Sequence, residues 1–479
     1  MLQYTLRRVL LMVPVFFLIS LLVFLLLNLA PGRPGERGGA ENGQSGKTEV
    51  TSESVMLFKQ QFSLDKPILL NTRSWMDQAE VRQLLSNAYG LEGDPLPAAR
   101  VAAREALEDY GYYLVRHQVA LILEDSNPAL RRAAAETLVL SAKKAMMSES
   151  AAGAEEVTST NRQIDAFNRE FREWKCGATE EVEPCLARIT PLWKGWWEQN
   201  HADYEYEGTE KLGSFFLDTR FAAYWYKLLH LDLGMSVVNH EPVLPQLVGR
   251  IKYSISLSLL SILLAYTLAV PLGVYSAVRP GSTADSVSTI GLFVLYSLPT
   301  FFTGTVLLKL LSQGTPLEIF PTGGFYNSDD PPQTTLGQLL DILWHIAMPV
   351  ATSTSVALAA LSRYARTGVI DVIRADYIRT ARAKGLSEPV VIIKHAVRNG
   401  MIPILTLLGG LLPVLVSGSV VIEVVFNIPG MGTFLIDAIN QRDYNVVMAV
   451  LLASSLLTQV GILISDLSYA LVDPRISLD

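Results

Sequence analysis

Cysteine and an excess of positive charge are both lacking in this 479-residue chain. It has two cysteines, Cys176 and Cys185, too few for a disulfide scaffold or a cysteine-rich metal site. Its 39 Lys and Arg do not outnumber its 46 Asp and Glu, which argues against nucleic-acid binding. Charged residues make up 18% of the chain, below the roughly 25% of a soluble domain. Part of the chain is therefore expected to lie in lipid.

The charges are unevenly distributed. Residues 31–245 hold 32 acids and 23 bases, a net charge of −9, whereas the rest holds 14 acids and 16 bases. An acidic, polar block thus lies inside an otherwise apolar chain, which excludes a wholly soluble protein.

Six apolar runs are long enough to cross a bilayer, which takes about 20 residues. The first, 9–30, is a retained helix or a cleaved signal peptide. A retained helix is favoured because the run exceeds the roughly 7–15 apolar residues of a signal peptide and residues 27–30 (LNLA) make a poor cleavage site. The other runs are about 253–275, 287–308, 343–362, 402–424 and 447–465.

Loop charges predict the orientation of these spans. Residues 363–401 carry eight bases against three acids, and 312–342 carry four acids and no base. The first loop is therefore expected in the cytoplasm and the second outside. Arg7 and Arg8 put the N-terminus in the cytoplasm, so the acidic block lies outside and both termini lie inside.

The cytoplasmic segment 363–401 is unusually long and has a helical pattern, with Ile370, Ile373, Tyr377 and Ile378 at helical spacing. Gly385 suits the left-handed position that ends a helix. Two interpretations remain open on composition: a solvated loop that only fixes topology, or a short helix that docks into a soluble partner.

The residues of this segment resemble the coupling loop of binding-protein-dependent ABC importer permeases, in the dipeptide, oligopeptide and nickel branch. The resemblance rests on 376–386 (DYIRTARAKGL) and 394–399 (KHAVRN), where Arg-Thr-Ala replaces the family's Glu-Ala-Ala. In that family the loop helix sits in a groove of a cytoplasmic ATPase. The resemblance implies that the contact to the ATPase is made by Asp376, Arg379, Thr380, Ala381, Ala383, Gly385 and His395.

Other segments resemble the family in the same order. They are 231–236 (LDLGMS), 421–432 (VIEVVFNIPGMG), 442–444 (RDY) and 471–475 (LVDPR), and the similarity covers 1–36 and about 222–479. The second segment implies an outer gate loop containing Glu423, Pro429, Gly430 and Gly432. Glu423 either lines the transport path or makes a structural hydrogen bond to the Pro429-Gly430 turn, and the latter is favoured.

The family has a modest loop after its first span, so about 150 residues are inserted here. Residues 97–107 and 128–138 match at Arg, Ala-Ala, Glu and Leu, 31 residues apart. They predict either a pair of HEAT-like helical repeats or a chance likeness of two Ala-rich helices. Residues 145–160 are expected to be a linker.

Cys176 and Cys185 lie in the part expected outside the cell, where disulfides persist, and a bridge is favoured over two free thiols. The nearby Trp193, Trp196 and Trp197 either bind a ligand or form a small core, and the core is favoured. Residues 43–48 (GQSGKT) imitate a phosphate-binding loop, but Glu41 stands where that motif needs glycine.

Three classes of function were weighed. A transport subunit without catalysis of its own is favoured over a membrane enzyme, because the spans carry no paired His, Asp or Glu. The third class, a sensor or scaffold with the insertion as receptor, is disfavoured by the coupling-loop resemblance. No cofactor, metal or catalytic residue is expected. The resemblance implies ATPase subunits, a second permease subunit and an extracytoplasmic solute-binding protein as partners, in the bacterial inner membrane.

The predicted fold is an all-α polytopic membrane protein of six transmembrane helices with a large helical insertion between the first two. Its expected parts are an N-terminal helix in 1–36, an extracytoplasmic region 37–245 with an inserted module at about 73–221 (the repeat pair at 97–138), and a five-helix core 246–479 containing the loop 363–401.

Overall fold

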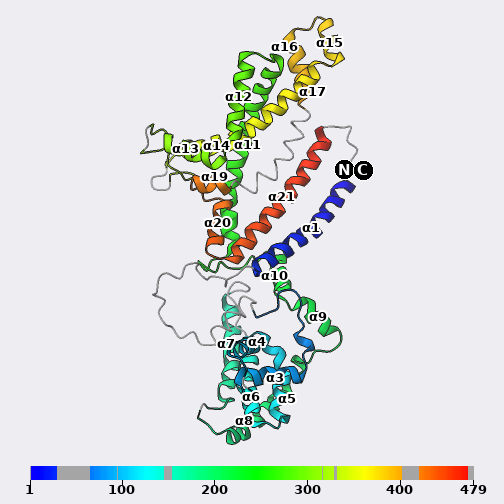
Figure 1. Ribbon diagram of the computed structural model, residues 1–479, viewed down its shortest axis with the longest axis vertical. Coiled ribbons are helices and arrows are strands. Elements are labelled where there is room, and N and C mark those ends of the chain that lie inside the picture. Colours follow the sequence, from blue (N-terminus) through cyan, green and yellow to red (C-terminus); the bar gives the residue numbers. More distant parts are fainter. Residues whose placement is uncertain are drawn as a thin grey trace. The chain divides into compact units, whose positions relative to one another are not determined.

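The computed structural model describes residues 2–29, 65–93, 95–144, 154–177, 179–314, 317–327, 332–401 and 420–472. The chain divides into two compact units, which we call the apolar unit (1–39 and 233–479) and the acidic unit (40–232). The described residues are mostly helical, as predicted (Figure 1).

Among the described residues of the apolar unit, four helices are long and apolar enough to cross a bilayer. They contain residues 9–29 of the predicted run 9–30, and the predicted runs 253–275, 343–362 and 447–465. These helices are α1 (Leu2–Leu29), α11 (Val243–Val278), α14 (Thr335–Ile373) and α21 (Tyr444–Val472).

The predicted run 287–308 does not form one straight helix. The chain bends by 101° between α12 (Thr283–Ser297) and α13 (Thr300–Leu311). Leu298 is extended at the break, because a residue before proline is disfavoured in helical conformation and Pro299 has no N–H to continue the ladder. The pair counts as a fifth span if it is one broken span. Residues 402–419 of the predicted run 402–424 lie outside the described residues.

A row of small residues lets α11 and α14 pack closely. Ser261, Ala265, Ala269, Gly273 and Ala277 recur every four residues and are all buried on α11. A Cβ on Gly273 would lie 2.4 Å from the Ala365 Cβ and 2.5 Å from the Ser362 carbonyl oxygen of α14. Such small-residue ridges drive helix association where lipid supplies no hydrophobic force.

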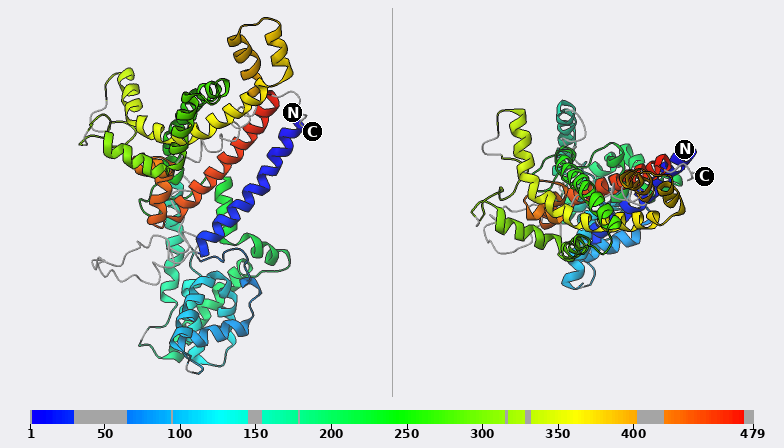
Figure 2. Two further views of the ribbon diagram at one scale, coloured as in Figure 1. Left: turned by 45° about the horizontal axis from the view of Figure 1, so that its top comes forward. Right: turned by 90° about the horizontal axis from the view of Figure 1, so that it is seen from above.

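Helices α1 and α21 run side by side in opposite directions (Figures 1 and 2). Arg8, near the start of α1, pairs with Asp466, near the end of α21, at 3.1 Å. The first and last helices therefore begin and end at the same face of the apolar unit.

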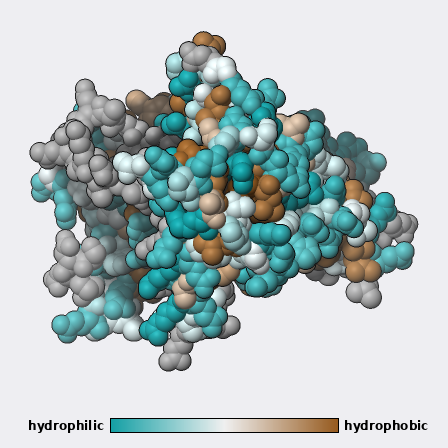
Figure 3. All heavy atoms as spheres, turned by 90° about the horizontal axis from the view of Figure 1, so that it is seen from below, coloured by the Kyte–Doolittle hydropathy of each residue, from teal (hydrophilic) through white to brown (hydrophobic). Residues whose placement is uncertain are grey.

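The acidic unit begins with two helical hairpins. In each hairpin the second helix starts with proline at its first turn, where the missing N–H costs nothing. The helices are α3 (Gln78–Tyr89) with α4 (Pro97–Tyr110), and α5 (Val115–Glu124) with α6 (Pro128–Ser141). The surface drawn in Figure 3 is mainly hydrophilic, with hydrophobic residues in small groups.

The two matching sequence segments occupy equivalent places in these hairpins. Leu107 and Leu138 are both buried, as are the paired alanines Ala103 and Ala134. These positions, at which the two segments match in sequence, are therefore positions whose side chains are buried in both hairpins.

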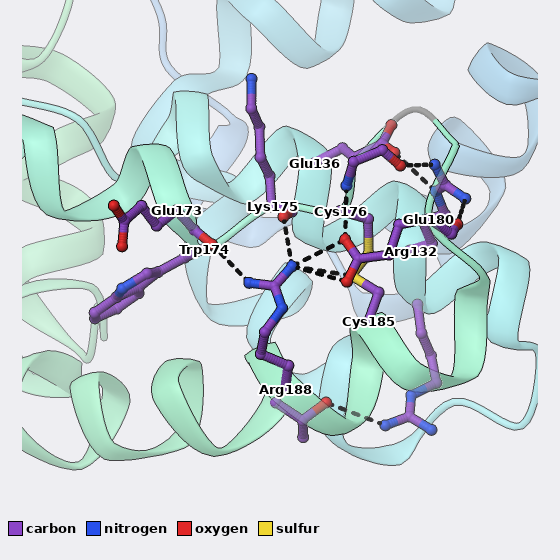
Figure 4. Close-up of a disulfide and its surroundings, with 12 residues drawn as sticks. Arg132, Glu136, Glu173, Trp174, Lys175, Cys176, Glu180, Cys185 and Arg188 are labelled. Carbon is purple, nitrogen blue, oxygen red and sulfur yellow. Dashed lines mark hydrogen bonds and ion pairs between the residues drawn. A yellow bond between two sulfur atoms is a disulfide. The ribbon is translucent and has the colours of Figure 1, made fainter.

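A disulfide joins Cys176 to Cys185 at the start of α8 (Val182–Asn200), with their Cα atoms 5.6 Å apart (Figure 4). Arg188 spans the same loop, donating to the Glu173 carbonyl at 2.9 Å and pairing with Glu180 at 3.0 Å. The disulfide and the contacts of Arg188 therefore hold the same loop, between Glu173 and Cys185, in place.

An aromatic core lies beside this loop, as predicted for the tryptophans. Trp193 is fully buried, stacks on Phe171 with ring centroids 5.4 Å apart, and donates to the Trp174 carbonyl at 3.1 Å. The linker prediction is wrong for 154–160, which begin α7 (Ala154–Glu170); residues 145–153 lie outside the described part of the chain.

Two segments of the acidic unit, one before and one after most of its helices, pair with each other. We call them the neck (65–71 and 215–221). Asn71 N–H donates to the Phe215 carbonyl at 2.9 Å, and Arg220 N–H donates to the Pro67 carbonyl at 2.9 Å. The chain therefore enters and leaves the helical module at one place.

Asp218 joins the neck to the first hairpins. It accepts from Lys66 Nζ at 2.7 Å and from the Tyr112 and Tyr113 hydroxyls. Although burial acts to raise it, hydrogen bonds from Lys66 and the two tyrosines hold the pKa of Asp218 below its usual range.

His117 gives the acidic unit a pH-dependent stability. Burial, and then the charge of Arg116, lowers the pKa of His117 to about 4, against about 6.5 in an unfolded chain. Between these values only the unfolded chain binds the proton, so folding stability falls as the pH falls from 6.5 to 4, by up to about 3 kcal/mol.

We expect His117→Gln to flatten this pH dependence. Six of the seven tryptophans lie in the acidic unit, so tryptophan fluorescence during denaturant unfolding at pH 7.5 and pH 5 reports on it. An equal loss of stability on acidification in both proteins would contradict the assignment.

Candidate functional site

The segment 363–401 folds as a chain of short helices, not as one helix through 370–384. Helix α14 ends at Ile373, Ala375 is extended, and α15 (Asp376–Ala383) starts anew. No proline or glycine marks this break in the sequence. After Gly385 come α16 (Glu388–Val390), the π-helical η5 (Val391–Val397) and α17 (Arg398–Gly400).

Helix α15 is held by its apolar face. Ile378 and Ala381 are buried in a cluster with Ala277 of α11, Val369 of α14 and Val391 of η5. Five of the seven residues predicted to contact the ATPase are exposed, and His395 lies half-buried in η5. The five are Asp376, Arg379, Thr380, Ala383 and Gly385.

The turn after α15 has the predicted geometry. Gly385 adopts a φ of +75°, a conformation that costs glycine little, and its N–H donates to the Arg382 carbonyl at 2.9 Å. Arg382 then crosses the turn in a two-bond pair with Glu388, at 3.1 and 2.7 Å.

Exposed apolar side chains lie beside these charges. Tyr377, Leu386, Val390 and Ile393 are all exposed, the last at 68%. We call these four residues, with Arg379, Thr380 and Arg382, the loop surface. A surface of apolar residues interspersed with cations is more typical of a protein interface than of a surface exposed only to water.

The loop is fastened to α14 by a backbone contact that the sequence did not reveal. A Cβ on Gly368 of α14 would lie 2.4 Å from the Gly400 carbonyl oxygen, and one on Gly400 would lie 2.9 Å from the Gly368 carbonyl oxygen. Neither position has room for a side chain, so α17 rests directly on the α14 backbone.

A second missed contact involves Arg366, which the sequence suggested only as a topology signal. Its guanidinium pairs with both oxygens of Asp285 on α12, at 3.1 and 3.0 Å. Asp285 also accepts from Gly281 N–H at 2.9 Å. This pair links the start of the bent α12–α13 segment to the part of α14 that opens the segment 363–401.

At the predicted outer loop, Glu423 of α19 (Val420–Val425) is fully buried. Its carboxylate accepts from the Ser254 hydroxyl at 2.7 Å and from the N–H groups of Gly432 and Thr433 at 2.6 and 3.2 Å. The last two begin α20 (Met431–Asn440). Glu423 therefore caps this helix, whose first N–H groups have no partner within the helix.

The glycines of this turn are required by the same carboxylate. A Cβ on Gly430 would lie 2.5 Å from the Glu423 carboxyl group, and one on Gly432 would lie 2.8 Å from Glu423 Oε2. Pro429 is exposed at the tip of the turn.

Two of the separate resembling segments meet near the start of α21. Asp443 is buried and accepts from the Ser236 hydroxyl at 2.5 Å and from Val237 N–H at 3.1 Å. Asn445 donates to the Met235 carbonyl at 2.8 Å. Residues 231–236 and 442–444 thus form one structure. Within the described residues, no group of three or more His, Cys, Asp or Glu is placed to hold a metal ion.

Comparison with known proteins decides the family. Residues 269–478 match the family described as binding-protein-dependent transport system inner membrane component. The chain is 39% identical over 246 residues to the oligopeptide transport system permease protein AppB of Bacillus subtilis, covering 51% of this chain and 76% of that protein. The chain belongs to this family.

The dipeptide transport system permease protein DppB of Escherichia coli K12 is similar too, 35% identical over 273 residues, or 54% of this chain and 80% of DppB. The di/tripeptide permease DppB of Pseudomonas aeruginosa is 37% identical over 258 residues, or 51% of this chain and 76% of that protein. The protein is thus an ABC importer permease of the dipeptide and oligopeptide branch, a multi-pass component of the inner membrane. The motif-based family prediction is confirmed.

Proposed function

We propose that this permease carries peptides or related small solutes and forms half of the translocation pathway, with a second permease subunit forming the rest. Its relatives are named as peptide permeases. ATP hydrolysis would come from a cytoplasmic ATPase subunit that docks on the loop surface. The observation that carries this proposal is the exposed, cationic and apolar loop surface, held rigidly by its own buried core.

The proposed topology has six spans with both termini in the cytoplasm. It is supported by the Arg8–Asp466 pair, which joins the start of the first helix to the end of the last helix, and by the excess of bases in 363–401. The acidic unit then lies outside, and residues 402–424 supply the fifth span.

The outer turn containing Pro429, Gly430 and Gly432 is proposed to face the solute-binding protein as a gate. Two observations support this proposal: Glu423 and Ser254 hold the start of α20 by hydrogen bonds, and Pro429 at the tip of the turn is exposed.

We predict that Gly385→Asp abolishes uptake while the protein still inserts into the membrane. No atom lies within 4 Å of a Cβ at this position, so the substituted residue does not clash within the chain. The cost comes from backbone strain, from a carboxylate at the end of α15, and from its projection into the docking partner.

Gly385→Asn is the matched control, because asparagine and aspartate adopt the left-handed conformation at a similar cost and only aspartate carries the charge. Both variants are compared for uptake and for substrate-stimulated ATP hydrolysis in the purified complex. Normal coupling in Gly385→Asp would show that the ATPase docks elsewhere.

Residues 73–221 are proposed to be a separately folding module that modulates docking of the binding protein. Support comes from the neck, where the chain enters and leaves at one place, and from the net charge of −9 in residues 40–232, which disfavours acidic partners and anionic lipid.

Deletion of 73–221 with a short Gly/Ser join should leave assembly with the ATPase intact and lower uptake only at limiting binding protein. Pull-down of the complex and uptake at graded binding-protein concentrations measure this. Failure to assemble would make the module part of the permease fold.

A further inference from the structure

Exposed apolar side chains in the acidic unit are concentrated next to the neck. Twelve large hydrophobic residues are exposed in the described part of this unit, and six of them lie between 212 and 231. They belong to α9 (Thr209–Leu217), to α10 (Arg220–Leu229) and to the turn that follows α10. The six are Leu212, Phe216, Leu217, Tyr226, Leu229 and Leu231.

Helix α10 places two of these six residues, Tyr226 and Leu229, on one face together with other apolar side chains. Ala222, Trp225, Tyr226 and Leu229 recur at three- and four-residue spacing, which places them on one face of a helix. The Thr219 hydroxyl caps the helix by accepting from Ala222 N–H at 3.1 Å, and the neck bonds hold Arg220 in place. The face is therefore presented by a fixed helix, not by a loose tail.

The net charge around α9 and α10 also differs from that of the rest of the acidic unit. Residues 209–231 contain two acids, Glu210 and Asp218, and three bases, Lys211, Arg220 and Lys227. This gives a net charge of +1 within a unit of net charge −9. Trp and Tyr with flanking Lys and Arg are the residues enriched where a bilayer meets water.

Chain length keeps α10 close to the membrane. Ser236 lies seven positions after Leu229 in the chain, and its hydroxyl donates a hydrogen bond to Asp443, next to the start of the spanning helix α21. A fully extended chain covers about 3.4 Å per residue, so the end of α10 lies within roughly 25 Å of that point.

We propose that α9 and α10 lie in the membrane–water interface, with their exposed apolar side chains among the lipid chains. The occupant of this face is the bilayer, and the segment anchors the base of the acidic unit to it. An amphipathic helix with an apolar face and basic flanks binds lipid in this way. The inference holds for whichever side of the membrane the acidic unit occupies, so it is independent of the proposed topology.

The test uses the full chain, co-expressed with its partner subunits and reconstituted in phosphatidylcholine nanodiscs. Single cysteines carrying an environment-sensitive fluorophore replace Phe216 or Leu229, and Val101 in α4 serves as the control because its exposure, 57%, matches the 59% of Phe216. Quenching is measured with brominated lipid and with aqueous iodide.

Brominated lipid should quench the labels at 216 and 229 at least threefold more than the label at 101, and iodide should show the reverse order. Quenching by iodide alone at 229 would overturn the proposal, since the face would then be in water. Protection from both quenchers would also overturn it, because a protein would then cover the face. Failure of the Gly385 or deletion predictions would leave these outcomes unaffected.

Discussion

Gly368→Val should reduce coupled uptake more than tenfold, because it pushes the loop surface off α14. The added Cβ would meet the Gly400 carbonyl oxygen at 2.4 Å, and a backbone atom cannot rotate away as a side chain can. Overpacking of this kind costs about 1–3 kcal/mol even where side chains adjust. Uptake and ATP hydrolysis by the reconstituted complex measure the effect.

Thr367→Val is the matched control, since Thr367 is exposed and its hydroxyl bonds only within α14, to the Arg363 carbonyl at 3.1 Å. It should leave both activities close to normal. Wild-type coupling in Gly368→Val would mean that α17 need not rest on α14 during transport.

Glu423→Ala should destabilise the protein by about 3–5 kcal/mol. The change removes the acceptor for the Ser254 hydroxyl and for the N–H groups of Gly432 and Thr433. Each buried donor left without a partner costs about 1–3 kcal/mol, and removal of the side chain also leaves a cavity. Thermal unfolding of the detergent-solubilised protein and its assembly with the partner subunits are the measurements.

Glu423→Gln separates a capping role from a role for the charge. The amide oxygen can accept from Gly432 and Thr433, while the amide nitrogen donates to the Ser254 oxygen, so this variant should lose much less stability than the alanine variant. If both variants fail alike, the negative charge itself is needed, and Glu423 acts in the transport path.

The site was predictable from sequence where it depends on local chemistry. Gly385 could be assigned to the end of α15 because a left-handed position favours glycine and the preceding helix was periodic. The exposure of Arg379 and the burial of Ile378 follow from the same periodicity. The break at Ala375 was not predictable, because it depends on packing of α15 against α11 and η5 and no local residue requires it.

The outer turn shows the same division. The sequence placed Glu423 near Pro429 and Gly430, and a structural hydrogen bond was favoured. Its partners are the N–H groups of Gly432 and Thr433 in α20 and the hydroxyl of Ser254, which is 169 residues away in the chain. Only the packing of α11 against α19 and α20 brings that hydroxyl to the carboxylate.

The sequence by itself determined the family, the helical class and the acidic unit, because hydrophobic length, charge and ordered motifs are local properties of the chain. Tertiary structure decided the contacts that hold the site: Gly368 against Gly400, Arg366 with Asp285, Ser236 with Asp443, and the neck closed by Asp218. Each joins positions distant in sequence, and nothing in the local sequence around one residue marks its partner. Only the close approach of two helices, or the loss of water around a buried carboxylate, makes those residues necessary where they stand.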